Sequence, residues 1–189
     1  MDYLQLINQN YTLPEKYRPT KLLLEPISNI WLEENTLLMF YKMNKSMQNE
    51  GLTALRLYSG YRSYACQNSL YLKTCRDAEL KFLTTMPEII QAGKSEHQLG
   101  TAIDVMTTIM SQRNSNIYEF DITFHKKWLD YNCKNFGFIL RYPKDKEDIT
   151  NISYRPYHYR YVGINHAIKM YNFNLCLEEY IPIYKSKRY

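Results

Sequence analysis

One ten-residue stretch decides how the chain is organised: Ser95-Glu96-His97-Gln98-Leu99-Gly100-Thr101-Ala102-Ile103-Asp104. Its histidine and its aspartate lie seven residues apart. The apolar residues on both sides of the aspartate are typical of the start of a buried strand. Gly100 permits a sharp turn of the backbone, since glycine adopts conformations that other residues avoid. We therefore expect a loop histidine, His97, and a strand aspartate, Asp104, to point toward one centre.

A second segment, RPYHYRYVG, supplies a candidate partner for these two side chains. It is typical of a short aromatic strand, with His158 near its start. Imidazole and carboxylate groups are ordinary zinc ligands, and a catalytic zinc takes three protein ligands and leaves a fourth position open. His97, Asp104 and His158 thus predict a zinc site. The other two histidines, His125 and His166, lie in helical contexts and are interpreted as structural.

Together the two segments resemble the motifs of the zinc D-alanyl-D-alanine peptidases of the vancomycin-resistance carboxypeptidase and dipeptidase type. The first family motif, Ser-x-His-x-x-Gly-x-Ala-x-Asp, is complete in this chain. The second, Glu-Pro-Trp-His-x-Arg-Tyr-Val-Gly, differs at two positions, because Arg155 replaces the catalytic glutamate and Tyr157 replaces the tryptophan. The segment Ser59–Ser63 resembles the substrate-binding Gly-Tyr-Arg-Ser element, and Gln67 follows at the familiar distance.

The resemblance implies roles for individual residues. Zinc would be held by His97, Asp104 and His158. Arg62 would bind the substrate close to the zinc and stabilise developing charge, while two further residues, Gln67 and Ser95, would hold the dipeptide end. The implied substrate is the D-Ala-D-Ala dipeptide or a peptidoglycan-precursor peptide that ends in it. Hydrolysis would release the terminal D-alanine and lower the pool of vancomycin-binding precursors.

Two arginines of the second motif, Arg155 and Arg160, lead to further expectations. The family glutamate takes a proton from water and passes it to the leaving amine, whereas the arginine at position 155 stays protonated. Loss of a positioned acid–base group typically costs ~10²–10⁴ in rate. We therefore expect hydrolysis to be slow. Arg160 would share a strand face with His158 and is expected to contact a carboxylate behind the ligands rather than substrate.

Two alternatives come from other functional classes. The chain could be a catalytically silent homologue that binds D-Ala-type ligands or acts through a partner. It could also be a peptidoglycan endopeptidase of the phage-lysin type, which would be expected to carry a cell-wall-binding module. No second module is visible in the sequence.

Length and composition favour one soluble domain. The 189 residues predict a single domain over 1–189 with an extended N-terminal arm over about 1–30. The net charge of +5 comes from basic residues spread along the chain, which does not favour nucleic-acid binding. Four cysteines without CxxC spacing are expected to be free, buried thiols. Neither a signal-peptide pattern nor a long apolar run is present, so we expect a cytoplasmic protein without a membrane span.

The order of periodic segments predicts an α+β fold, with helices around a small, mainly antiparallel sheet. By resemblance, this is the hedgehog/D,D-peptidase-like fold. The predicted elements are helices over 32–50, 63–80, 123–136, 165–171 and 175–180, strands over 55–58, 101–107, 138–142 and 157–162, a loop over the site at 84–94, a surface excursion at 111–116 and a charged turn at 144–148.

Overall fold

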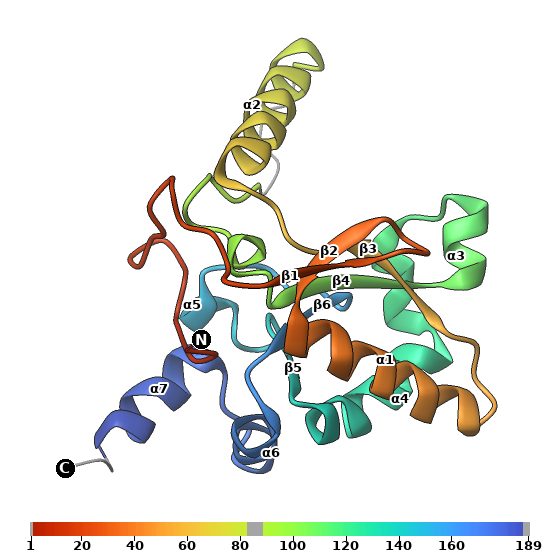
Figure 1. Ribbon diagram of the computed structural model, residues 1–189. Helices are drawn as coiled ribbons and strands as arrows, with labels where there is room; N and C mark the ends of the chain where they lie inside the picture. The colour runs from red at the N-terminus through yellow and green to blue at the C-terminus, as the bar shows by residue number, and fades with distance from the viewer. Residues whose placement is uncertain (1, 83–88, 187–189) are drawn as a thin grey trace.

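The computed structural model describes residues 2–82 and 89–186, and its centre is a four-stranded antiparallel sheet (Figure 1). The strand order is β3-β4-β6-β5, so β4 lies inside the sheet. This confirms the predicted α+β class and the predicted central strand. The four strands are β3 (Leu55–Ser59), β4 (Ala102–Thr107), β5 (Phe138–Leu140) and β6 (His158–Tyr161).

A separate two-stranded hairpin occupies part of the expected N-terminal arm. Strand β1 (Leu22–Glu25) pairs with β2 (Ile30–Glu33) in antiparallel register. The turn between them places Asn29 at a positive φ of 56°, a conformation that asparagine tolerates better than most residues. The carboxylate of Glu25 accepts hydrogen bonds from two backbone amides of that turn. The turn residues Glu25 and Asn29 thus form a hairpin in a segment whose apolar residues and prolines predicted an extended arm.

Helix α1 (Glu34–Asn49) covers the sheet with its methionine-bearing face. Met43 and Met47 are fully buried, as the four-residue spacing predicts. The helix begins two residues later than position 32, because Leu32 belongs to β2 and Glu33 accepts a hydrogen bond from the amide of Thr36 as the N-cap. The chain leaves the helix through a glycine at position 51 with a φ of 87°.

Helix α2 (Tyr64–Leu80) projects away from the body of the molecule (Figure 1). Ser63 caps it by accepting a hydrogen bond from the amide of Cys66, as predicted. Only Gln67 and Ala78 of this helix are buried. The predicted loop 84–94 follows; residues 83–88 lie outside the described residues, and 89–94 contain neither helix nor strand.

The C-terminal half contains more helix than expected. Residues 108–113 form a short helix that overlaps the surface excursion predicted at 111–116, and Thr107 caps this helix by accepting a hydrogen bond from the amide of Met110. The predicted helix over 123–136 narrows to a 3₁₀ turn after residue 132, and Gly137 ends it with a φ of 81°. Another short helix, over 147–150, begins within the predicted charged turn at 144–148. These helices are α3 (Thr108–Arg113), α4 (Phe124–Asn132), α5 (Glu147–Thr150), α6 (Ile164–Asn172) and α7 (Leu177–Ser186), with 3₁₀ helices η1 (Glu96–Leu99), η2 (Ile117–Ile122) and η3 (Cys133–Phe136).

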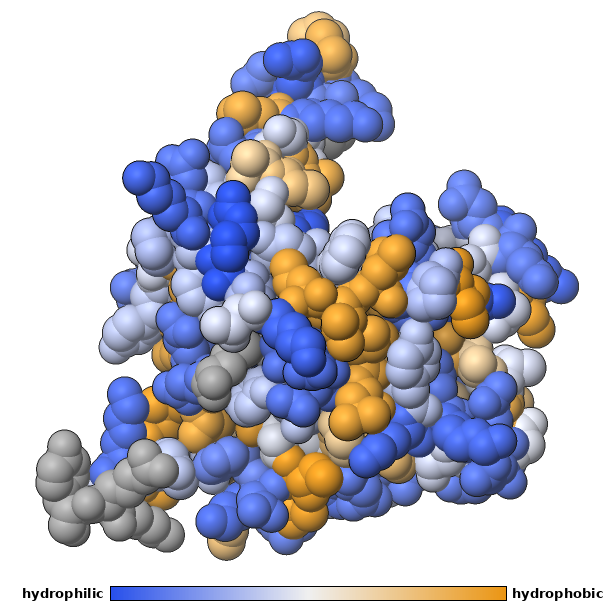
Figure 2. Space-filling view, viewed as in Figure 1, coloured by the Kyte–Doolittle hydropathy of each residue, from blue (hydrophilic) through white to orange (hydrophobic). Residues whose placement is uncertain are grey.

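Part of the molecular surface near the hairpin is apolar. Figure 2 shows apolar surface across the middle of this face, over the β1–β2 hairpin, whose Leu23, Leu24 and Ile27 are exposed. No helix among the described residues is long and apolar enough to cross a membrane. All four cysteines are free thiols, as predicted. The prediction that all four are buried is wrong, because only Cys133 and Cys176 are buried.

Candidate metal centre

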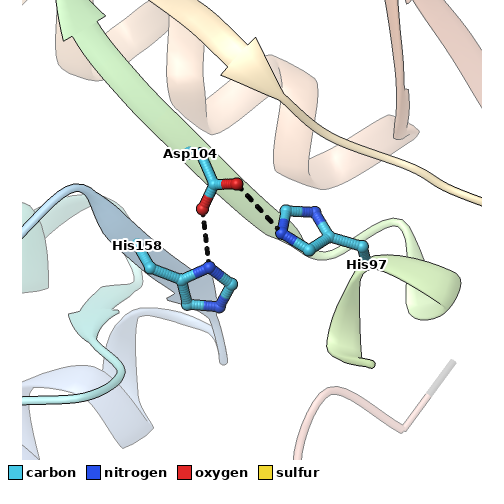
Figure 3. A group of neighbouring side chains, drawn as sticks. All are labelled: His97, Asp104 and His158. Carbon is cyan, nitrogen blue, oxygen red and sulfur yellow. Dashed lines mark hydrogen bonds and ion pairs between the residues drawn. The ribbon is translucent and has the colours of Figure 1, made fainter. Parts of the chain in front are cut away.

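Three side chains from three different elements meet in one buried group (Figure 3). His97 comes from η1, Asp104 from β4 and His158 from β6. Nε2 of His97 lies 3.2 Å from Oδ2 of Asp104, and Nδ1 of His158 lies 2.7 Å from its Oδ1. One potential ligand atom from each residue lies within 4.8 Å of the other two. All three residues are buried, with exposed fractions of 2, 7 and 2%.

The local backbone explains why these residues meet. Asp104 and His158 are direct partners across the β4–β6 ladder, and opposite residues of an antiparallel pair share one face. Gly100 ends η1 in the left-handed conformation with a φ of 72°, which turns the chain from the helix that carries His97 into β4. A Cβ there would lie 3.2 Å from the backbone nitrogen of Glu33. The expected sharp turn at Gly100 is therefore present.

His97 is oriented by a backbone carbonyl. Its Nδ1 donates a hydrogen bond of 2.6 Å to the carbonyl oxygen of Gly60, which leaves Nε2 facing Asp104. Gly60 cannot carry a side chain without displacing its neighbours, since a Cβ would lie 2.5 Å from the side chain of Ile30. Burial and the nearby charge of Arg62 lower the pKa of His97 to about 4. The ring is thus neutral near pH 7, as a metal ligand must be.

Asp104 supplies the negative charge of the group. Burial alone would raise the pKa of its carboxyl, but the adjacent rings of His97 and His158 hold that pKa well below its usual value. The group therefore combines one carboxylate with two imidazole rings. This is a normal donor set for a zinc ion that keeps one open position.

His158 lies between two carboxylates, and this arrangement tests whether the site fits a metal. Oδ1 of Asp104 faces one ring nitrogen, and Oε2 of Glu96 lies 3.9 Å from the other, Nε2. Neither Nε2 nor Oε2 has a hydrogen-bond partner in the described part of the chain. A neutral imidazole carries one proton and cannot donate to both sides. A cation on the Asp104 side would leave the proton facing Glu96, so the residues fit a metal.

Of the three predicted substrate-side residues, Arg62 interacts with this group and Ser95 lies two residues before His97. The backbone amide of Arg62 donates to the carbonyl of His97, and its charge acts on both His97 and Asp104. Burial, partly offset by Asp104, lowers the pKa of the Arg62 guanidinium. Gln67 donates its amide to the carbonyl of Ile90, 2.5 Å away, and Ser95 caps η1. Gln67 and Ser95 therefore hold the local backbone, and their contact with substrate stays a prediction.

Arg155 is half-buried and lies close to the group. Its carbonyl accepts from the amide of His158, and its amide donates to the carbonyl of Tyr142. Its guanidinium lies over the Tyr142 ring, 5.6 Å from the centroid. Its charge contributes to the lowered pKa of Arg62. Tyr157, at the position of the family tryptophan, packs edge-on against Tyr118 with ring centroids 5.2 Å apart.

A network of buried ion pairs lies behind the candidate ligands, and the sequence predicted only the part made by Arg160. Arg160 contacts a carboxylate, as expected: its Nη1 lies 3.1 Å from Oε1 of Glu96. Arg141 binds the same oxygen through Nε at 2.8 Å and reaches Glu178 on α7. Burial disfavours the charge of Glu96, but Arg141 and Arg160 hold its pKa far below the ordinary value. Arg141 and Glu178 are 37 residues apart, and no local pattern signals their contact.

The other two histidines and a cavity are not part of the candidate metal group. His125 contacts the carbonyl and hydroxyl of Thr53, and His166 bonds Tyr180, which agrees with structural roles for both. A cavity of about 1090 Å³ lies between the N-terminal segment 2–12 and α7. None of the three candidate ligands lines that cavity.

An antiparallel sheet with helices around it and a buried His–Asp–His group is the arrangement that the sequence resemblance implies for the D-alanyl-D-alanine peptidases. Residues 29–164 match the family model described as VanY, D-alanyl-D-alanine carboxypeptidase, and the chain belongs to this family.

Several relatives resemble the chain over nearly its whole length. The putative carboxypeptidase YodJ of Bacillus subtilis is 35% identical, over 97% of this chain and 68% of the relative. The bifunctional D-Ala-D-Ala dipeptidase and D-Ala-D-Ala carboxypeptidase VanXYC of Enterococcus gallinarum is 34% identical, over 95% of this chain and 94% of the relative. The crystal structure of a point mutant of the vancomycin resistance D,D-pentapeptidase VanY, from a VanB-type resistance cassette and in complex with Zn(II), superposes with a TM-score of 0.79. It is 31% identical, over 96% of this chain and 99% of that one.

Proposed function

We propose that the chain is a zinc-dependent D,D-carboxypeptidase-type protein that binds peptidoglycan-precursor peptides ending in D-Ala-D-Ala. The observation that carries the proposal is the buried group of His97, Asp104 and His158, whose ligand atoms lie within 4.8 Å of one another. We further propose that hydrolysis of the terminal peptide bond is slow, because Arg155 occupies the position of the family's catalytic glutamate.

Zinc is supported by the donor set and by a relative. Two neutral imidazoles and a carboxylate suit zinc, and the VanY relative was crystallised in complex with Zn(II). When bound, zinc supplies Lewis-acid chemistry, polarising a scissile carbonyl and activating water near neutral pH. The protein's part is to present His97 through Nε2, with Nδ1 held by the carbonyl of Gly60, and His158 through Nδ1, the ring nitrogen that faces Asp104.

A D-alanyl peptide is supported by the charge near the group. Arg62 brings a guanidinium whose fork of N–H donors suits a terminal carboxylate or a carbonyl oxygen that gains charge. The VanXYC relative is named for activity on D-Ala-D-Ala. We assign the main ligand contact to Arg62. Gln67 and Ser95 support this side of the site by holding the loop at Ile90 and the start of η1.

The slow hydrolysis is supported by the chemistry of position 155. A guanidinium remains protonated and cannot accept a proton from water. The Arg155 charge lies near enough to Arg62 to lower its pKa, so the side chain adds positive charge to the site. The same observation favours a second candidate function, a catalytically silent homologue that binds D-Ala-type ligands without cleaving them.

A combined binding and release assay tests the proposal. Purified protein with one equivalent of zinc is mixed with D-Ala-D-Ala dipeptide or with a pentapeptide ending in D-Ala-D-Ala. We expect zinc-dependent binding of both and slow release of D-alanine. Binding without any release supports the silent homologue, whereas absence of both binding and release contradicts the proposed substrate class.

A further inference from the structure

Glu96 is a buried carboxylate that faces the side of His158 away from Asp104. Its residue is 1% exposed, and its Oε2 lies 3.9 Å from Nε2 of His158. Asp104 occupies the other side of the ring, 2.7 Å from Nδ1. In the proposed metal-bound state Nδ1 is a ligand, so the ring proton belongs on Nε2. Donation of the second ring N–H to a carboxylate is the usual way in which a metal-binding histidine is oriented.

Glu96 is in turn held by two arginines. Nε of Arg141 donates to Oε1 at 2.8 Å, and Nη1 of Arg160 lies 3.1 Å from the same oxygen. All three side chains are at most 1% exposed. Because both cations engage Oε1, the other oxygen, Oε2, is left to face His158. The arginines therefore determine which way the carboxylate points.

Both arginines are anchored by the ends of the described chain. The guanidinium of Arg141 donates to both carboxylate oxygens of Glu178 on α7, at 2.9 and 2.6 Å. Nη2 of Arg160 donates to the carbonyl oxygens of Tyr3 and Gln5, at 3.1 Å each. These anchors lie outside residues 29–164, the part that matches the family model. Figure 1 shows α7 at the edge of the molecule, away from the strands that carry the ligands.

We propose that Glu96 is a positioning residue for His158, and that α7 maintains it through the Glu178–Arg141 ion pair. The inference rests on the proposed zinc site. Its consequence is that zinc affinity depends on a C-terminal helix that contributes no ligand. The path runs from Glu178 through Arg141 and Glu96 to His158, and each step is a contact between buried or nearly buried groups.

Zinc affinity of matched variants tests this path. Glu96→Ala removes the acceptor, and Glu178→Gln weakens the anchor of Arg141 at the outer end of the path. Glu179→Gln is the control, because Glu179 lies on the same helix but pairs with Lys146. We expect Glu96→Ala to weaken zinc binding by about 10- to 100-fold, measured by competition with a chelator. Glu178→Gln should cause a smaller loss, and Glu179→Gln none.

A spectroscopic readout separates positioning from general stability. In zinc-loaded wild type, ¹H–¹⁵N spectra of the histidine rings should show His158 with a protected Nε2–H, shifted downfield by the carboxylate. Glu96→Ala should lose that signal. Persistence of the signal in the variant, or equal zinc affinity in Glu178→Gln and Glu179→Gln, would overturn the inference while leaving the zinc site intact. If Glu96→Ala does not fold, the Glu178→Gln comparison decides. Absence of zinc binding by wild type would overturn the inference and the proposed function together.

Discussion

The guanidinium of Arg155 lies over the ring of Tyr142, 5.6 Å from its centroid. His158 stacks on the same ring with centroids 5.0 Å apart, and the guanidinium of Arg141 lies 4.8 Å from its centroid. The rings of Tyr142 and His158 thus lie between the Arg155 guanidinium and the candidate metal ligand Asp104. Arg155 is at the position where the family motif has a glutamate. In the proposed function this relationship separates two properties of the site, because the three proposed metal ligands meet while Arg155 stands where the family motif has glutamate.

The first prediction concerns the metal ligands. His97→Ala and His158→Ala should each abolish the binding of one zinc per chain, because each removes one of three protein ligands. Metal analysis of the purified variants measures this. Chelation should also lower the melting temperature of wild type, since metal-binding free energy adds to folding free energy. His125→Ala is the control, and full zinc content in both ligand variants would rule out this site.

The second prediction concerns Arg62. D-Ala-D-Ala should raise the melting temperature of the zinc-loaded protein, as does any ligand that binds only the native state. Arg62→Ala should remove this shift and leave zinc content unchanged. Arg76→Ala, on the exposed side of α2, is the matched control. Equal thermal shifts in wild type and Arg62→Ala would show that Arg62 has a different role.

The third prediction concerns the pH dependence of stability in the metal-free protein. The pKa of His97 is lowered to about 4 in the fold by burial and Arg62, in surroundings that also include Asp104 and His158. Since a histidine in the unfolded chain titrates near pH 6.5, the unfolded chain binds more protons than the native state between these values. Stability contributed by the neutral ring is therefore nearly full above pH 6.5 and falls on acidification.

The size of this loss of stability follows from how far the pKa of His97 is lowered in the fold. The free energy of unfolding should fall by about 2 kcal/mol between pH 7 and pH 5 on account of His97. Urea unfolding in the presence of chelator, at pH 7 and pH 5, measures this for wild type and His97→Gln. The variant should lose less stability over that range. Asp104 and Glu96, whose pKa values are lowered, act below this window, because their contribution is lost only as pH falls through acid values. Identical losses in both proteins would refute the assignment to His97.

The ligands themselves were predictable from sequence because their geometry is mostly local. His97 and Asp104 are seven residues apart, and Gly100 supplies the turn between them. Adding His158 needed the resemblance to a known family. The β4–β6 register then accounts for its position opposite Asp104.

Contacts that depend on distant segments were not predictable in the same way. The Glu178–Arg141 pair joins α7 to the residue that follows β5, and no pattern in the sequence signals this contact. The β1–β2 hairpin and α3 were missed because caps and turns formed by Glu25 and Thr107 outweighed weak local periodicity. Strand and helix formation in such short segments depends on tertiary context more than on propensity.

The most direct test of the central claim is release of D-alanine by zinc-loaded variants at position 155. Wild type should cleave a pentapeptide ending in D-Ala-D-Ala slowly, and Arg155→Glu should raise the rate by ~10²-fold or more, because a carboxylate can accept a proton from water. Arg155→Gln removes the charge without supplying a base and should stay slow. Tyr157, in place of the family tryptophan, is expected to limit the gain. A fast wild type with no gain in Arg155→Glu would contradict the account and identify another residue as the base.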